Sequence, residues 1–179
     1  MATRVELHRG DISAFEADVI VTPAHSSLFG GEGIDAEIHS VGGPIILKET
    51  QLLREVKYTD GLPDGEAVST NAGNLSAKWV IHTVAPEYSA SEDHSAMLQS
   101  CYLESIELAN KLSALTVAFP AIGAGAFGWP SADVARIAID AIRSTDTHIE
   151  LVTFVLSSDE AMTAFGVELA AIDEEVGER

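Results

Sequence analysis

Residues 19–35, VIVTPAHSSLFGGEGID, and residues 117–130, VAFPAIGAGAFGWP, each run from an apolar strand through a glycine-rich turn into a predicted helix. Glycine permits positive φ values and lets the backbone approach a ligand closely, and the free N–H groups at a helix start attract anions. Either turn alone is also consistent with a tight strand-to-helix connection. Two such turns on one sheet predict a site that holds a pyrophosphate from both sides, and therefore a phosphorylated small molecule as ligand.

Apolar strands alternate with helical patterns along the whole chain. The strands are expected at residues 5–8, 18–21, 67–70, 79–84, 116–119 and 149–156. The helices are expected at residues 34–41, 44–57, 95–112, 131–142 and 159–172. This alternation predicts an α/β fold in which helices cover both faces of a mixed central sheet of about six strands. Ligands of such sheets bind beyond the carboxyl ends of the strands, where both glycine turns lie.

The composition indicates one soluble domain over residues 1–172, followed by an acidic, flexible tail at residues 173–179. The 179 residues are 46% hydrophobic and 6% aromatic, and a chain of this length buries a substantial core. No apolar run approaches the roughly 20 residues that cross a bilayer, and the N-terminus lacks a signal-peptide pattern. The one cysteine, Cys101, is expected to be a small core residue. We expect a cytoplasmic monomer with no membrane partner.

The net charge of −18 comes from 28 acidic residues against 10 lysines and arginines. Such a field repels nucleic acid and anionic membrane surfaces, so we expect neither as a partner. The field also opposes any anionic ligand. Local backbone amides and helix dipoles must therefore hold a phosphate here.

Four motifs follow one another in a fixed order. Gly10-Asp11-Ile12 comes after the first strand, and residues 28–39 read LFGGEGIDAEIH. Residues 78–86 read KWVIHTVAP, and residues 119–130 read FPAIGAGAFGWP. They resemble the motifs of macro domains, the ADP-ribose-binding modules. Those motifs include Leu-x-Gly-Gly-Gly-Gly-Val-Asp-x-x-Ile-His, Lys-x-Val-Ile-His-Thr-Val-x-Pro and Phe-Pro-Ala-Ile-Ser-Thr-Gly-x-Tyr/Phe-Gly-x-Pro. The resemblance covers roughly residues 4–165 and implies a three-layer α/β/α macro domain.

The resemblance also implies which residues bind the ligand. Asp11 would accept a hydrogen bond from the adenine amino group, with the Ile12 N–H at the ring edge; from the residues alone, Asp11 is equally well a turn or helix-cap aspartate. Backbone N–H groups would contact the proximal phosphate and the distal ribose from Gly31, Glu32, Gly33 and Ile34. The second turn would wrap the diphosphate with Gly123, Ala124, Gly125, Ala126 and Phe127. The Phe127 ring would lie against the distal ribose, or it would be a hydrophobic plug in its loop.

Asp35 suggests catalysis. In the MacroD-like hydrolase branch that this chain resembles, an aspartate at this place lies close to the distal ribose and helps to activate water. A carboxylate can act as a general base and can stabilise positive charge at an anomeric carbon. Without the resemblance, Asp35 is an ordinary first-turn aspartate that interacts with the dipole of its helix.

Three positions depart from the pattern of that branch. His25 stands where the branch has the second asparagine of Asn-Ala-Ala-Asn, which contacts the distal ribose; histidine can donate or accept that hydrogen bond. Glu32 replaces a glycine beside the phosphate path. Ser157 stands where many relatives stack an aromatic residue on adenine.

The resemblance therefore leaves two functions open. One is a hydrolase that removes mono-ADP-ribose from acidic side chains or deacetylates O-acetyl-ADP-ribose, with Asp35 and His25 at its catalytic centre. The other is a non-catalytic reader of ADP-ribose or a related nucleotide. Either function implies ADP-ribose or its conjugates, including ADP-ribosylated protein, as partners and no cofactor. We also expect no metal site, because the chain lacks the cysteine and histidine ligands of the zinc-dependent macro domains, and we interpret His39 and His82 as structural.

Overall fold

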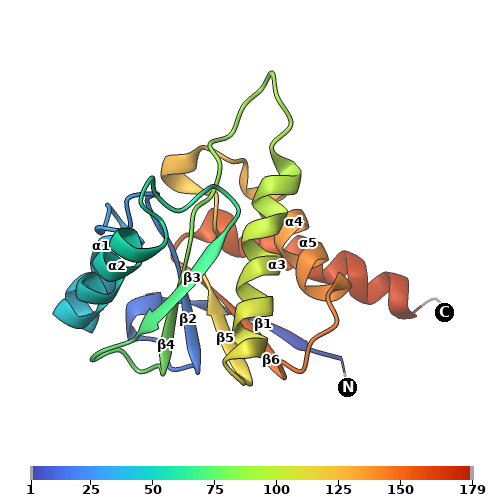
Figure 1. The fold of residues 1–179 in the computed structure, drawn as a ribbon. Coiled ribbons are helices and arrows are strands. Elements are labelled where there is room, and N and C mark those ends of the chain that lie inside the picture. The colour runs from blue at the N-terminus through green and yellow to red at the C-terminus, as the bar shows by residue number, and fades with distance from the viewer. Residues whose placement is uncertain (1, 178–179) are drawn as a thin grey trace.

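The computed structural model describes residues 2–177, and it arranges them as helices on both faces of a central sheet (Figure 1). The strands are β1 (Arg4–Arg9), β2 (Val19–Pro23), β3 (Ala67–Asn71), β4 (Trp79–Thr83), β5 (Thr116–Phe119) and β6 (Leu151–Leu156). The α-helices are α1 (Ile34–Gly42), α2 (Pro44–Val56), α3 (Ser95–Lys111), α4 (Ser131–Ser144) and α5 (Asp159–Gly177). Two short 3-10 helices, η1 (Ile12–Ala14) and η2 (Gly125–Phe127), follow β1 and β5.

One mixed sheet contains all six strands in the order β1-β6-β5-β2-β4-β3. Neighbouring strands run parallel, except that β3 pairs antiparallel with β4. The predicted α/β fold with a mixed sheet of about six strands is confirmed. Because five strands are parallel, their carboxyl ends lie along a single edge of the sheet.

Side chains that alternate along the strands build one core on each face of the sheet. In β2, Val19 and Val21 belong to the core that α3, α4 and α5 cover. Ile20 between them belongs to the core that α1 and α2 cover, with Ile38 and Ile46 from those helices. All three β2 residues are fully buried, as is usual for a parallel strand covered on both faces. Figure 1 shows the same division, with α1 and α2 away from the other three helices.

The structure differs from the sequence prediction mainly at short or terminal elements. Neither η1 nor η2 was expected, because three residues are too few to show a helical period. Helix α5 continues to Gly177, five residues beyond its predicted end at residue 172. Alanine and glutamate are strong helix formers, which explains the extension into the acidic segment. The predicted flexibility of the tail stays a prediction, and residues 178–179 lie outside the described residues.

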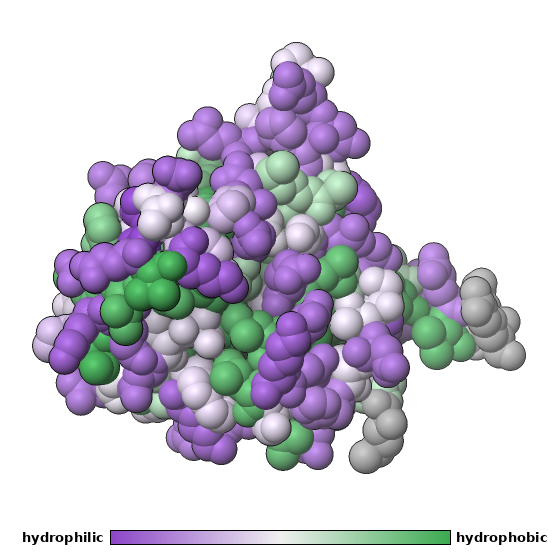
Figure 2. Space-filling view, in the orientation of Figure 1, coloured by the Kyte–Doolittle hydropathy of each residue, from purple (hydrophilic) through white to green (hydrophobic). Residues whose placement is uncertain are grey.

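Hydrophilic residues cover most of the face seen in Figure 2, and apolar residues appear between them in separate groups. Two of the exposed apolar side chains, Leu52 and Val56, lie on α2. Cys101 is fully buried in α3, which confirms it as a core residue. Within residues 2–177, none of the helices has both the length and the apolar character of a membrane span.

Candidate functional site

The carboxyl ends of the parallel strands bring together five segments that are far apart in the sequence. Strand β1 leads to Asp11, β6 leads to Ser157, and β4 leads to residues 84–86. The first glycine turn, residues 25–33, follows β2, and the second glycine turn, residues 123–128, follows β5. Because β2 and β5 are adjacent and parallel, both turns lie at the same edge of the sheet.

Both glycine turns contain backbone that only glycine adopts easily. Gly33, at the start of α1, has φ 61°, and Gly125 has φ 70°; a Cβ at either position would meet no atom within 4 Å. These two glycines therefore border open space. Gly123 is different, because its φ is 101° and a Cβ there would lie 3.0 Å from Leu98.

A cavity of about 490 Å³ lies at the ends of β1 and β6. Four of the predicted ligand-binding residues line it: Asp11, Ile12, Gly33 and Ile34. Ser157 also lines this cavity, with Arg9, Gly10, Glu37 and Val155. The structure thus joins the expected adenine position to the first glycine turn.

Asp11 caps the short helix η1. Its Oδ1 accepts hydrogen bonds from the Ser13 backbone N–H at 2.8 Å and from the Ser13 hydroxyl at 2.7 Å. This is the helix-cap role that the residue type alone allowed. Because both bonds use Oδ1, the cap is compatible with a second contact at Oδ2, and the predicted contact with adenine stays a prediction.

A second cavity, of about 400 Å³, lies at the other end of the first glycine turn. His25 and Phe127 line it together with Asp64, Glu87, His94 and neighbouring apolar residues. The structure therefore brings His25 and Phe127 to one cavity, although 102 sequence positions separate them.

The remaining predicted binding residues lie in the turns between these two cavities. Glu32 is exposed and lines neither cavity. Gly31 borders a third cavity, of about 540 Å³, beside α1 and α2. Gly123 is buried, and Gly125 and Ala126 are exposed. Ala124 is half-buried. The expected contacts of their backbone N–H groups with phosphate stay predictions.

Asp35 is a buried carboxylate in the first turn of α1, with 2% of its surface exposed. Its Oδ1 accepts a hydrogen bond from the Thr22 hydroxyl at 3.0 Å and lies 3.7 Å from Nε2 of His39. Burial raises the pKa of the Asp35 carboxyl above its ordinary value, while His39, the Thr22 hydroxyl and His25 act in the opposite direction. A carboxylate with a raised pKa is better suited to accept a proton near neutral pH.

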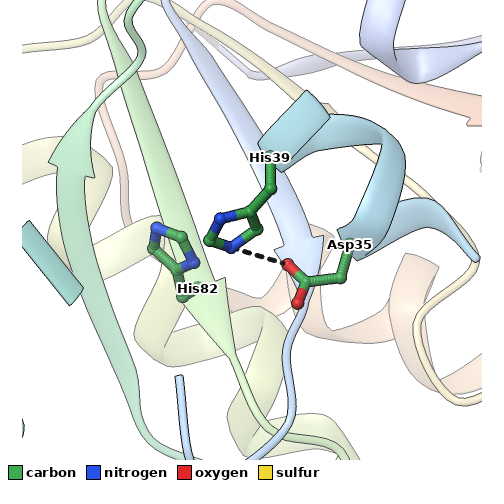
Figure 3. A group of neighbouring side chains, drawn as sticks. All are labelled: Asp35, His39 and His82. Carbon is green, nitrogen blue, oxygen red and sulfur yellow. Dashed lines mark ion pairs between the residues drawn. The ribbon is translucent and has the colours of Figure 1, made fainter. Parts of the chain in front are cut away.

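His82 points from β4 toward the same carboxylate (Figure 3). It pairs in register with Thr22 of β2, which explains why both side chains face α1. Its Nε2 lies 2.9 Å from the Thr70 hydroxyl, whereas its Nδ1 is buried without a hydrogen-bond partner within residues 2–177. Burial lowers the pKa of His82 to about 3, so the imidazole is neutral at physiological pH.

Asp35, His39 and His82 form a cluster whose oxygen and nitrogen atoms lie within 4.8 Å of one another (Figure 3). One carboxylate and two imidazoles are donors of the kind that Zn²⁺ binds. In the structure the Asp35 carboxylate lies 3.7 Å from Nε2 of His39, beside a neutral His82. Both histidines were expected to be structural, and this cluster was not predicted. The four-residue spacing of Asp35 and His39 on one helix face was the available signal. The expectation of no metal stays a prediction.

Comparison with known proteins agrees with the motifs. The macro domain family matches residues 21–138. A macro domain-containing protein of Streptomyces nogalater is 51% identical over 167 residues, which cover 93% of this chain and 92% of that protein. A protein of Pantoea vagans named O-acetyl-ADP-ribose deacetylase 1 is 43% identical over 141 residues, which cover 78% of this chain and 81% of that protein.

Solved structures show the same architecture. The Oceanobacillus iheyensis macrodomain, solved with ADP, superposes with a TM-score of 0.90 at 31% identity, covering 97% of this chain and 93% of that chain. The Trypanosoma brucei macrodomain, solved with ADP-ribose, gives a TM-score of 0.82 at 27% identity, covering 92% of this chain and 68% of that chain. The six-stranded sheet, the paired glycine turns at its edge and these matches have one explanation: the chain belongs to the macro domain family.

Proposed function

We propose that this protein binds ADP-ribose between its two glycine turns and hydrolyses esters of ADP-ribose. The substrates are mono-ADP-ribose on acidic side chains or O-acetyl-ADP-ribose. The observation that carries the hydrolytic part is Asp35, a carboxylate buried at the ligand edge of the sheet whose pKa is raised by that burial.

The shape of the site supports the binding part. The cavity at Asp11 and the cavity at His25 lie at opposite ends of the first glycine turn, an arrangement suited to a ligand with a base at one end and a ribose at the other. Gly33 and Gly125 border open space with positive φ, so a diphosphate could approach their backbone closely. The relatives solved with ADP and ADP-ribose support the same ligand class.

The chemistry follows from the Asp35 carboxylate. Both proposed substrates are esters that join a carboxylic acid to a ribose oxygen. Asp35 accepts a proton from water while the water oxygen bonds to the carbonyl carbon of the ester. The bond from that carbon to the ribose oxygen then breaks, and the proton passes from Asp35 to the ribose oxygen. The products are free ADP-ribose and a carboxylic acid. The acid is the side chain of glutamate or aspartate for the first substrate and acetic acid for the second. The phosphate contacts would hold the ester in place for this step.

A second candidate function is a reader that binds ADP-ribose without turnover. Two residues favour it: His25 in place of the ribose-contacting asparagine, and Glu32 in place of a glycine beside the phosphate path. The reader needs the same binding residues, so binding alone does not separate the two functions.

Calorimetry with ADP-ribose and a turnover panel test the proposal. The panel contains O-acetyl-ADP-ribose and peptides that carry mono-ADP-ribose on glutamate, and release of ADP-ribose is the readout. We expect binding, turnover of at least one substrate, and a loss of turnover of at least about tenfold in Asp35→Asn with affinity within about twofold. Asp133→Asn, in the first turn of α4, is the matched control. Binding without any turnover would establish the reader, and no binding at millimolar ADP-ribose would contradict both.

A further inference from the structure

Arg54, on α2, forms a hydrogen bond with the backbone of the first glycine turn. Its Nη1 donates to the Ser27 carbonyl at 2.7 Å, while Nε and Nη2 donate to the carbonyls of Tyr58 and Thr59 at 2.7 and 3.2 Å. The guanidinium also lies over the ring of Phe29, 5.0 Å from its centre. One cation thus ties the turn to the segment that follows α2.

Backbone contacts strengthen the same junction. The Leu62 N–H donates to the Ser26 carbonyl at 2.8 Å. Gly61 has φ 105°, and a Cβ there would lie 3.0 Å from that carbonyl oxygen, so the two segments pack closely. Arg54 therefore holds the first glycine turn at Ser27, next to the backbone contact at Ser26.

The anchored residue, Ser27, in turn holds the His25 ring. The Ser27 backbone N–H donates to Nδ1 of His25 at 3.1 Å, and the Ser27 hydroxyl lies 2.9 Å from the same nitrogen. A backbone N–H can only donate, so Nδ1 must be the acceptor and the neutral ring carries its proton on Nε2. Nε2 is then an N–H donor, like the amide nitrogen of an asparagine, on a residue that lines the second cavity.

We propose that Arg54 is a positioning residue that acts through Ser27. It orients His25 so that Nε2–H donates to a hydroxyl of the distal ribose, and it thereby sets the preference for ADP-ribose over ADP, which lacks that ribose. This inference rests on the proposed function only for the identity of the ligand. It does not require turnover.

The test compares two dissociation constants, for ADP and for ADP-ribose, by calorimetry. In Arg54→Met and in Arg54→Lys, which keeps the cation but not the planar fork, the preference for ADP-ribose should fall about three- to tenfold, the effect of one hydrogen bond. The affinity for ADP should stay within about twofold. Arg143→Met, on the exposed end of α4, is the control and should leave both constants unchanged. If Arg54→Met fails to fold, Arg54→Lys decides by the same ratio.

A double-mutant cycle separates positioning from a general structural role. His25→Ala should lower the preference by itself, and adding Arg54→Lys to His25→Ala should then change the preference no further. An equal loss of ADP and ADP-ribose affinity, an unchanged preference, or an effect that persists without His25 would overturn the inference. A wild type that binds neither nucleotide would overturn the proposed function as well, which distinguishes the two failures.

Discussion

At the scale of single residues, Asp35 is a buried side chain, and burial disfavours the ionised form of its carboxyl group. Because folding raises its pKa, the folded protein holds the Asp35 proton more tightly than the unfolded chain does. Any stabilisation from this group is therefore present below the ordinary pKa of 3.8 and is lost as the pH rises through the folded pKa. Above the folded pKa, the ionised carboxylate makes folding less favourable than a neutral group would.

Asp35→Asn should therefore stabilise the protein at pH 7 while it removes turnover, because the amide can still accept the Thr22 hydrogen bond. We expect a higher melting temperature than that of the wild type at pH 7, and a difference that shrinks toward pH 4. Thermal unfolding across that range measures it. A variant that is less stable than the wild type at pH 7 would contradict the cost of burying this charge.

His82 predicts the opposite pH dependence. Its pKa falls from 6.5 in the unfolded chain to about 3 in the folded protein, so the unfolded chain takes up the proton first on acidification. Stability should decline by up to about 1.4 kcal/mol per pH unit below pH 6.5. His82→Leu should show a smaller decline between pH 7 and 5, and His148→Gln, at an exposed position, should follow the wild type. Denaturant unfolding at both pH values is the measurement, and parallel curves for His82→Leu and wild type would count against the prediction.

At the scale of elements, Gly123 and Gly125 of the second turn differ in their surroundings. Gly123 packs against Leu98 and Trp129, whereas Gly125 faces open space. Gly125→Ala should cost about 1–2 kcal/mol from its positive φ alone. Gly123→Ala adds a contact of 3.0 Å to the same strain, so its melting temperature should be clearly lower. Equal melting temperatures of the two variants would show that the Leu98 contact relaxes without cost.

Elements were also the level at which the sequence was most informative. Strong periodicity and glycine turns predicted six strands, five helices and the edge where both turns lie, and the resemblance to macro domains added Asp11 and Ser157 to that edge. The cluster of Asp35, His39 and His82 was not predicted, because it depends on the register between β2 and β4. A period of two shows which residues share a face of one strand, but it does not show which residue of the next strand lies alongside. The hydrogen bond from Arg54 to the Ser27 carbonyl was not predicted either, because it joins segments 27 positions apart in the sequence.

At the scale of the whole molecule, the charge of −18 predicts an unusual response to salt. The field opposes a diphosphate, and added salt screens this repulsion more than it weakens backbone hydrogen bonds. Raising the ionic strength from about 10 to about 150 mM should therefore leave ADP-ribose affinity unchanged or improve it about twofold. Calorimetry at both salt concentrations is the measurement. A severalfold loss of affinity would show that cationic side chains, with Arg9 the first candidate, hold the phosphates.

The pairing of β1 with β6 has a consequence for how the protein is made. Strand β1 lies at the end of the six-stranded sheet, beside β6. Residues 4–9 can therefore pair in the sheet only once residues 151–156 are present. Closing so long a loop is slow, because its entropy is lost before the contacts form. On a growing chain the cavity that Asp11 and Ser157 line is therefore the last part of the site to assemble. A nascent chain shorter than about 156 residues would contain both glycine turns but lack the β6 side of the cavity that Asp11 lines.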